Sequence, residues 1–354
     1  MSSARTTGRR PAESTDSAAL LNWFDRVKRP LPWRLDRDPY RVWISEAMLQ
    51  QTRVETAIPF FERFLHALPS LEELARADEA RVRALWSGLG YYRRAGMLHE
   101  AARRIVANGW FPKTAREWQL LPGVGPYTAA AVASIAFGEK VAAVDGNVER
   151  VLTRFEAYGQ NPKSAAGRRF IARVAEGWLE DERPGDGNQA LMELGATVCL
   201  PSRPLCESCP IAAGCRARRL QKVDAYPYRP PPTAKRDVRM IAVCVRHGGR
   251  LLLFRRGAGE QLLAGTWEIP WVRSGEPNPE VALARRYGGI WKIGRRLATV
   301  RHSITTRRIS VGAHQGTFDG EEVEQGTEVA WANLVELERL PHSSLVRKLF
   351  LAAF

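Results

Sequence analysis

The sequence predicts a multi-domain protein in which an all-α domain precedes an α+β domain. Three observations favour this fold class. The 354 residues exceed what one compact core usually holds, apolar residues keep a helical spacing to about residue 219, and β-type runs begin after residue 236. With 45 % hydrophobic and 26 % charged residues, the chain can bury real cores and is not disordered throughout.

The charge balance indicates a polyanionic partner. Lys and Arg number 53 against 38 Asp and Glu, a formal net charge of +15. No apolar run approaches the roughly 20 residues of a membrane span, and the N-terminus lacks the apolar stretch of a secretory signal. We therefore expect a cytoplasmic protein of prokaryotic type, associated with the nucleoid and with no membrane partner. Residues 1–17 are expected to form a disordered basic tail.

The elements are predicted in chain order as follows. Apolar residues recur every three or four positions in 42–65, 71–86 and 129–137, which predicts helices within a domain spanning 18–216. Between 216 and 236 lie seven Lys or Arg and four Pro, so 217–236 is expected to be an extended basic linker. Residues 239–246 and 250–255 predict strands around a His-Gly-Gly turn, and 299–317 predicts two more. The second domain is thus expected over 237–354.

Four of the five cysteines lie within 17 positions, at Cys199, Cys206, Cys209 and Cys215. Such clustering favours a metal centre over disulfides. The set contains one Cys-x2-Cys pair, with a more distant cysteine before it and another after it. Zinc sites usually have their ligands in two closely spaced pairs. A 4Fe-4S cluster therefore fits better, and zinc remains the alternative. Cys244 lies in an apolar run and is predicted to be a buried strand residue.

A glycine turn occurs at 121–127, with the order Leu-Pro-Gly-Val-Gly-Pro-Tyr, before an Ala-rich helix. Gly123, Val124 and Gly125 can leave backbone N–H groups facing outward at a helix N-terminus, which suits a DNA phosphate. A plain connection between two helices would use the same residues.

Two carboxylates are candidates for acid–base chemistry. Glu46 stands among apolar residues, where desolvation would raise its pKa and keep a proton available; a helical Glu facing solvent is the alternative. Asp145 follows an apolar run and opens a helix. It is expected to cap that helix, and a carboxylate held in this way also suits a developing cation.

These features together resemble the MutY-type adenine DNA glycosylases of the helix-hairpin-helix superfamily, with endonuclease III as a relative. The matching segments are 31–34 (Leu-Pro-Trp-Arg), 45–52 (Ser-Glu-Ala-Met-Leu-Gln-Gln-Thr), 88–92 (Gly-Leu-Gly-Tyr-Tyr), the turn at 121–127, 145–148 (Asp-Gly-Asn-Val) and the four cysteines. The resemblance implies a helix-hairpin-helix domain with a 4Fe-4S loop at 199–215. It also implies base-excision DNA repair, with adenine removed opposite 8-oxoguanine or guanine and the abasic strand left uncut.

The resemblance also implies roles for individual residues. Glu46 would be the general acid, and Asp145 would oppose the sugar cation with Tyr127 and Asn147 as helpers. Gln51 would wedge into the DNA stack. The adenine pocket and DNA-binding positions would be Arg29, Leu31, Trp33, Arg34, Gln50, Gln51, Gly88, Tyr91, Gly123, Val124, Gly125 and Gln189. The partner would be mispaired double-stranded DNA, bound by a monomer.

The segment after the linker resembles the Nudix-like 8-oxoguanine-recognition domain of the same family, most visibly at 263–270. The Glu-rich helix that a Nudix hydrolase needs for magnesium is not matched at 280–289, so hydrolysis is not expected. Where the family usually has Phe-Ser-His, this chain has Ile304-Thr305-Thr306. Ser303, Thr305 and Thr306 are the candidates for reading the opposite base.

Two other hypotheses remain. An endonuclease III-like lyase would need a Lys nucleophile where this chain has Tyr127, and tyrosine cannot form a Schiff base. A DNA-binding scaffold without catalysis would explain the charge and the glycine turn. It would not require both Glu46 and Asp145.

Overall fold

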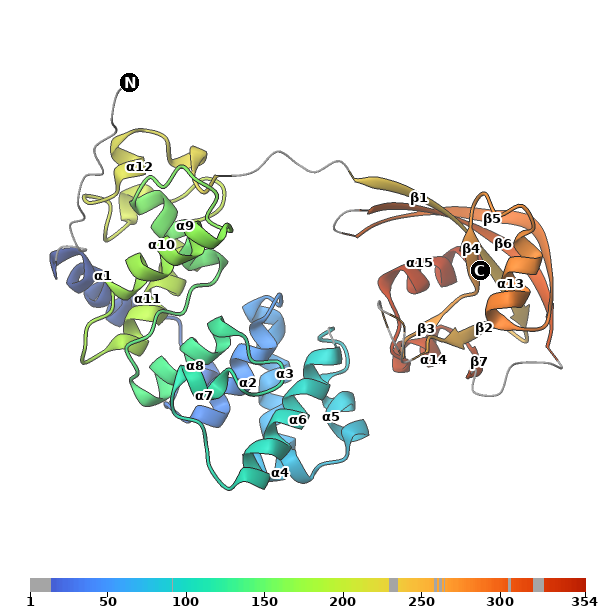
Figure 1. The fold of residues 1–354 in the computed structure, drawn as a ribbon, viewed down its shortest axis with the longest axis horizontal. Helices are drawn as coiled ribbons and strands as arrows, with labels where there is room; N and C mark the ends of the chain where they lie inside the picture. Colours follow the sequence, from blue (N-terminus) through green and yellow to red (C-terminus); the bar gives the residue numbers. More distant parts are fainter. Residues whose placement is uncertain are drawn as a thin grey trace. The chain divides into compact units, whose positions relative to one another are not determined.

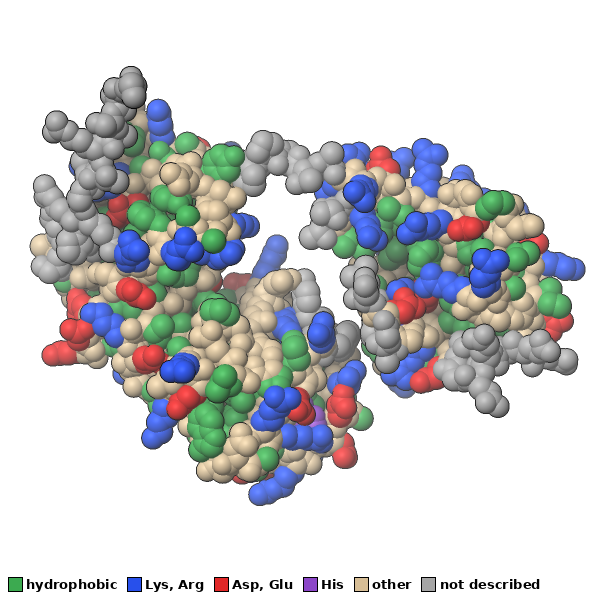
Figure 2. Space-filling view, viewed as in Figure 1, with side chains coloured by type: hydrophobic (Ala, Val, Ile, Leu, Met, Phe, Trp, Pro, Cys, Tyr) green, Lys and Arg blue, Asp and Glu red, His purple; other side chains and the backbone are tan. Residues whose placement is uncertain are grey.

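The computed structural model describes residues 14–90, 92–228, 235–257, 260, 263, 265–304, 307–320 and 328–354. The chain divides into two compact units, Met1–Pro230 and Pro231–Phe354, and Figure 1 draws the first mostly as helices and the second around a sheet. Lys and Arg side chains are spread over the face of both units that Figure 2 shows. None of the described helices is long and apolar enough to cross a membrane.

The described part of the first unit is helical. Its elements are α1 (Ser14–Val27), η1 (Pro32–Arg34), α2 (Pro39–Leu49), α3 (Val54–Ala67), α4 (Leu71–Arg76), α5 (Glu79–Trp86), α6 (Tyr92–Asn108), α7 (Ala115–Trp118), α8 (Pro126–Phe137), α9 (Gly146–Phe155), α10 (Ala165–Glu176), α11 (Pro184–Thr197), η2 (Cys206–Ser208), α12 (Arg216–Arg219) and η3 (Val223–Ala225). The expected all-α class is confirmed for this unit.

Two hydrophobic cores lie inside the first unit. The first gathers the apolar faces of η1 and α2 to α8 around Trp43, Trp86 and Trp118. The second joins α1 to α9, α10 and α11 around Phe24 and Trp178. The N-terminal helix therefore packs with the last helices of the unit, because Leu20, Leu21 and Phe24 on α1 need an apolar partner.

Two expectations about boundaries were wrong. The tail was expected to reach residue 17, but α1 begins at Ser14, and Ser17 is buried because the helix packs on α11. The linker is not extended from 217, because α12 and η3 fold onto the first unit, where Ala217 is fully buried. The helices expected within 42–65 are present as two helices, with a break at Gln51, whose backbone is left-handed with φ 61°.

Two helices of the first unit approach closely and fix the loop that leads to Asp145. A Cβ on Gly185 of α11 would lie 2.5 Å from the Ser134 carbonyl oxygen of α8. Asn188, fully buried on α11, donates to Ser134 Oγ (2.9 Å) and the Val141 carbonyl (2.9 Å) and accepts from the Ala143 amide (2.9 Å). Because the buried side-chain amide of Asn188 makes all three hydrogen bonds, it fixes the position of the loop before Asp145.

The second unit is α+β, as expected. It contains β1 (Arg236–His247), β2 (Arg250–Arg255), β3 (Trp267–Glu268), β4 (Trp271–Arg273), α13 (Pro279–Tyr287), β5 (Ile290–Ile304), β6 (Arg307–Asp319), β7 (Val329–Ala332), α14 (Leu334–Arg339) and α15 (Ser344–Ala353). The sheet order is β3-β2-β1-β6-β5, with β1 parallel to β6; β4 pairs with β1 and β7 with β2. The strands expected in 299–317 are longer than that range.

Alternation along β1 divides the sheet into two apolar faces. Ala242 and Cys244 face a core shared with α15, whereas Val243 and Val245 face a core shared with α13. Cys244 is fully buried, which confirms that prediction. Helices on both faces explain why this strand reads as an unbroken apolar run.

We expect Gly185→Ala to lower the free energy of unfolding by about 1 to 3 kcal/mol, because the added methyl group forces α8 and α11 apart. Denaturant unfolding of the full chain measures this. Gly159→Ala is the control, since a Cβ there meets nothing within 4 Å, and it should stay within about 0.5 kcal/mol of wild type. Equal free energies of unfolding for the two variants would contradict the close approach of α8 and α11 at Gly185.

Candidate active site and cysteine pocket

A cavity of about 520 Å³ lies within the first unit, between its two hydrophobic cores. It brings together eleven residues that the sequence singled out: Arg29, Leu31, Trp33, Arg34, Glu46, Gln50, Gln51, Tyr127, Asp145, Asn147 and Gln189. They come from η1 and the residues before it, α2 and the turn that ends it, and α8, α9 and α11. The lining does not include Gly88, Gly123, Val124 or Gly125, and Tyr91 lies outside the described residues.

The Glu46 carboxyl is buried in the cavity wall. Its helix α2 is buried from Val42 to Met48, so the side chain is 6 % exposed. Burial raises the pKa of Glu46 to about 7; the nearby Asp145 charge adds to this, while the Tyr127 hydroxyl and Arg34 oppose it. Among the described residues, nothing hydrogen-bonds Oε2 of Glu46. The carboxyl therefore holds a proton near neutral pH and has an oxygen available to a ligand.

Asp145 caps α9 and lines the same cavity. Its Oδ1 accepts from the Val148 amide at 2.7 Å and its Oδ2 accepts from Asn147 Nδ2 at 2.9 Å. Burial raises the pKa of Asp145, but these bonds oppose the rise because they favour the charged form. Capping and a cavity-facing carboxylate occur together, as the sequence predicted.

Tyr127 comes from the first turn of α8, next to Glu46. Its hydroxyl donates to Met192 Sδ at 3.7 Å and also interacts with the Glu46 carboxyl. Burial and the two nearby carboxyl groups hold the pKa of this tyrosine well above its usual range. The hydroxyl thus remains a proton-bearing donor, and the position offers no amine.

Sequence reasoning missed one charged residue of the cavity lining, Glu193. This 1 % exposed carboxylate on α11 accepts from Arg29 Nε at 2.6 Å and from Arg34 Nη2 at 2.9 Å. Burial alone would raise the pKa of Glu193, but hydrogen bonds and charge from the two arginines outweigh it and hold the pKa low. The signal was present, because Glu193 lies one helical turn after Gln189, which accepts from Arg34 at 3.0 Å.

Arg150 on α9 joins the cavity wall to the cysteine loop. Its Nη2 donates to Asn147 Oδ1 at 2.9 Å and to the Gly195 carbonyl at 2.8 Å, and its Nε donates to the Cys199 carbonyl at 2.8 Å. Asn147 is therefore held between Asp145 and Arg150.

The glycine turn ends at α8, whose N-cap is Gly125. Gly123 has φ 76°, and a Cβ there would meet Met97 Cβ at 2.8 Å, so only glycine fits this turn without strain. Both glycines are exposed while Val124 is buried. The turn is thus fixed from beneath, with its backbone open to solvent.

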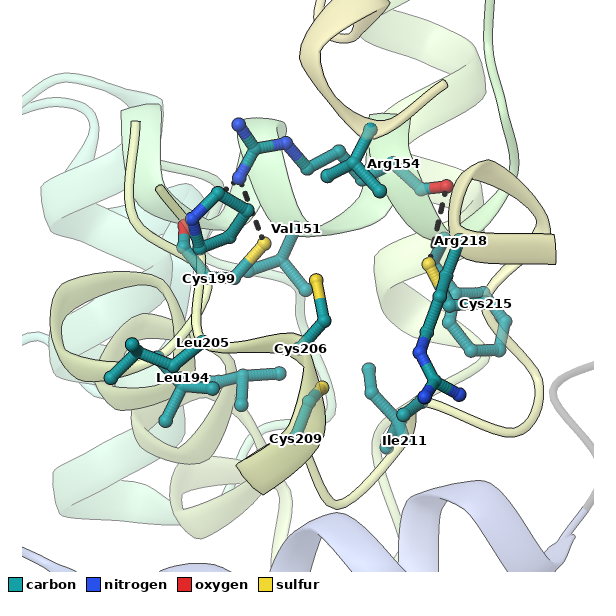
Figure 3. A pocket seen from close by; sticks show the side chains of 15 residues that line it. Val151, Arg154, Leu194, Cys199, Leu205, Cys206, Cys209, Ile211, Cys215 and Arg218 are labelled. Carbon is teal, nitrogen blue, oxygen red and sulfur yellow. Dashed lines mark hydrogen bonds between the residues drawn. The ribbon is translucent and has the colours of Figure 1, made fainter. Parts of the chain in front are cut away.

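The four clustered cysteines line one small pocket of about 30 Å³. Figure 3 shows Cys199, Cys206 and Cys209 close to one another and Cys215 across the pocket beside Arg218. Arg154, 1 % exposed, donates to Cys199 Sγ at 3.3 Å. Among the residues that the structure describes, no three His, Cys, Asp or Glu side chains are grouped so as to hold one metal ion.

The chemistry of this donor set fits an inorganic cluster. Burial raises the pKa of Cys206 and Cys215 and raises that of Cys209 to about 12, and the neighbouring cysteines add to each rise. Cations are therefore needed to favour the thiolate form here, and a metal cation binds that form directly. Arg154 and Arg218 would offset the negative charge of four thiolates.

Of the residues expected to read the opposite base, Thr305 and Thr306 lie outside the described residues. Ser303 is exposed at the end of β5, and its hydroxyl accepts from Lys235 Nζ at 3.4 Å. Glu280, at the start of the helix that a Nudix hydrolase would use, accepts from the Ile293 amide at 2.7 Å.

Comparison with known proteins agrees with this architecture. Residues 44–175 match the family model of the HhH-GPD superfamily of base excision DNA repair proteins, and residues 240–352 match the NUDIX domain. A solved thermostable thymine-DNA glycosylase is 29 % identical with a TM-score of 0.53, covering 58 % of this chain and 95 % of its own. The fold and the site thus define a glycosylase-type protein of the helix-hairpin-helix superfamily with a Nudix-like second unit.

Three relatives are named adenine DNA glycosylase. The protein of Schizosaccharomyces pombe is 34 % identical, covering 73 % of this chain and 69 % of the relative. Those of Rattus norvegicus and Homo sapiens are 42 % and 50 % identical, covering 72 % and 57 % of this chain. The chain spans only 59 % and 39 % of these two mammalian relatives. This chain belongs to the adenine DNA glycosylase family.

We expect Glu193→Gln to lower the free energy of unfolding by about 3 kcal/mol at pH 7, because it leaves Arg29 and Arg34 without their buried counter-charge. The pKa of Glu193 is lowered by folding, so its contribution exists above the unfolded pKa and disappears as the pH falls. Urea unfolding at several pH values should show that the difference in the free energy of unfolding between variant and wild type becomes smaller as the pH is lowered.

The control is Glu100→Gln, which removes an exposed ion pair with Arg104. It should change the free energy of unfolding by less than about 0.5 kcal/mol. If Glu193→Gln changed the free energy of unfolding by no more than this control, the buried ion pairs of Glu193 would contribute nothing to stability.

Proposed function

We propose that this protein is a base-excision DNA repair glycosylase that removes adenine mispaired with 8-oxoguanine or guanine and leaves an abasic site in an uncut strand. The observation that carries the proposal is that Glu46 and Asp145 line one cavity in a member of the adenine DNA glycosylase family. Burial raises the pKa of Glu46 to about 7; burial also raises the pKa of Asp145, but hydrogen bonds from Val148 and Asn147 oppose that rise and support its charged form. Opposite protonation states are what N-glycosidic cleavage needs.

The reaction begins with a base that has left the helix. Flipping adenine out of the duplex costs a few kcal/mol and is easiest at a mispair. The cavity of about 520 Å³ has room for a purine, with Trp33 and Leu31 as apolar walls and Arg34 and Gln189 as polar partners. Gln51 would fill the space that the base leaves in the stack.

Glu46 then gives its proton to a ring nitrogen of adenine. The electron pair of the bond between sugar and base leaves with the protonated adenine, and positive charge develops on the sugar. Ionised Asp145 stabilises this cation by its charge or by a transient bond to the sugar carbon. Water then adds its hydroxide to that carbon and passes its proton to a carboxylate, which gives the abasic product.

The second unit would contribute the choice of opposite base, with Ser303, Thr305 and Thr306 as the candidate readers. The partner is mispaired double-stranded DNA, bound by a monomer in the cytoplasm beside the nucleoid. The excess of Lys and Arg supports DNA binding because each phosphate contact releases counterions.

We also propose that Cys199, Cys206, Cys209 and Cys215 hold one 4Fe-4S cluster. Such a cluster, when bound, supplies a rigid anchor for the loop rather than chemistry on the base. Zinc is the competing occupant.

The experiment that tests the function is base release from a duplex containing one adenine opposite 8-oxoguanine. We expect free adenine, an intact strand at neutral pH, and cleavage only after alkali treatment of the abasic site. Tyr127→Lys should introduce some strand cleavage through a Schiff base that borohydride traps. Robust cleavage by wild type would favour a lyase, and tight binding without any release would favour a scaffold.

Glu46→Gln and Asp145→Asn should each slow single-turnover adenine release at least 10²-fold while leaving mispair binding largely intact. Because the acid must be protonated, the wild-type rate should fall as the pH rises above about 7, the pKa of Glu46. It should also fall in acid, once Asp145 becomes protonated. A rate within about 10-fold of wild type for either variant would disprove the role of that residue.

The purified protein should be brown, with broad visible absorption and about four iron and four sulfide per chain. Cys206→Ser should weaken folding or DNA binding more than it slows the chemical step, because the loop is structural. A colourless, fully active protein with one bound zinc would refute the cluster assignment.

A further inference from the structure

The side chain of Arg94 on α6 binds the end of α2, the helix that carries Glu46. Its Nη1 lies 2.8 Å from the Ala47 carbonyl oxygen, 3.4 Å from that of Met48 and 2.5 Å from that of Gln50. The Leu49 carbonyl accepts from the Thr52 amide at 3.2 Å. The last carbonyls of a helix have no hydrogen-bond donor inside that helix. Here one guanidinium nitrogen acts as the donor for three carbonyl oxygens at the end of α2.

The turn that Arg94 holds has an unusual backbone. Gln51 has φ 61°, a left-handed conformation that a residue with a side chain adopts only when its surroundings enforce it. The helix cannot continue through such a residue, so the carbonyls before it need other donors. A positive guanidinium also suits the negative end of the helix dipole.

The same turn is fixed from the opposite side by α8. Gln50 Nε2 donates to Thr128 Oγ1 at 3.1 Å, and Thr128 follows Tyr127. Gln50 and Gln51 line the cavity together with Glu46. The end of α2 is therefore held between α6 and α8 where it meets the site.

We propose that Arg94 is a positioning residue for base flipping: it holds the Gln50–Gln51 turn in the shape that lets Gln51 enter the DNA stack and keeps Glu46 at the cavity wall. The proposal rests on the proposed function, since it concerns how adenine reaches that cavity. Arg94 itself does not line the cavity. Its effect passes through the carbonyls of α2.

A general stabilising role is the competing explanation, and the chain offers a matched control. Arg103, nine residues further along α6, donates from Nε to the Ala75 carbonyl at 3.3 Å and from Nη2 to the Ala77 carbonyl at 3.5 Å. It thus holds the end of α4 by the same chemistry. Neither Arg103 nor the residues that it binds line the cavity.

The experiment compares Arg94→Gln with Arg103→Gln in the full chain. Thermal unfolding gives the loss of stability, and fluorescence of 2-aminopurine in place of the adenine reports flipping. Single-turnover release at saturating enzyme gives the chemical rate, and hydrogen exchange reports the amides of residues 50–52. We expect similar losses of stability, but only Arg94→Gln should lose the flipping signal, speed exchange at 50–52 and slow release by about 10²-fold.

Arg94→Lys, which keeps a charged donor, should recover part of the flipping signal, and Arg103→Lys is its control. If Arg94→Gln does not fold, the lysine pair carries the same comparison. Equal effects at positions 94 and 103, or a wild-type flipping signal in the Arg94 variants, would overturn the proposal. Loss of exchange protection at 50–52 without any adenine release by wild type would instead reject the proposed function and leave the positioning of the turn standing.

Discussion

The removal of the Glu46 carboxyl from water is the constraint on which the site depends. A carboxyl group in water is ionised at neutral pH, and burial is the main cause that raises the pKa of Glu46 to about 7, with the nearby Asp145 charge adding to it. That burial requires α2 to be apolar on nearly every side, and α2 is in fact buried without a break from Val42 to Met48. The packing of the first hydrophobic core is therefore also what sets the proton affinity of the site.

The second carboxylate is placed by a different local rule. Asp145 lies where it does because a helix N-terminus needs a side-chain acceptor, and the loop before it is locked by Asn188. Burial raises the pKa of Asp145 as well. Hydrogen bonds from Val148 and Asn147, which Glu46 lacks, oppose that rise. Burial thus raises the pKa of both carboxyl groups in the cavity, but these hydrogen bonds restrain the rise for Asp145.

Features governed by local rules could be predicted from the sequence. Helical spacing located most of the first unit, capping placed Asp145 at the start of α9, and the apolar run around Cys244 indicated a buried strand. The misses depend on contacts between distant segments. Glu193 lies one turn after Gln189, but its role as the buried partner of Arg29 and Arg34, about 160 positions earlier, shows only in the folded chain. The left-handed Gln51 likewise depends on donors from α6.

The cysteine loop and the cavity are parts of one packed structure. Asn147 donates to Asp145 and accepts from Arg150, and Arg150 donates to the Cys199 carbonyl. Each bond is about 3 Å long, so a displacement of the loop at Cys199 must be absorbed by the guanidinium or passed to Asn147. Because close-packed interiors transmit strain, the geometry around Asp145 depends on how firmly the loop is held. A centre in that loop can therefore matter for the chemistry without touching the substrate.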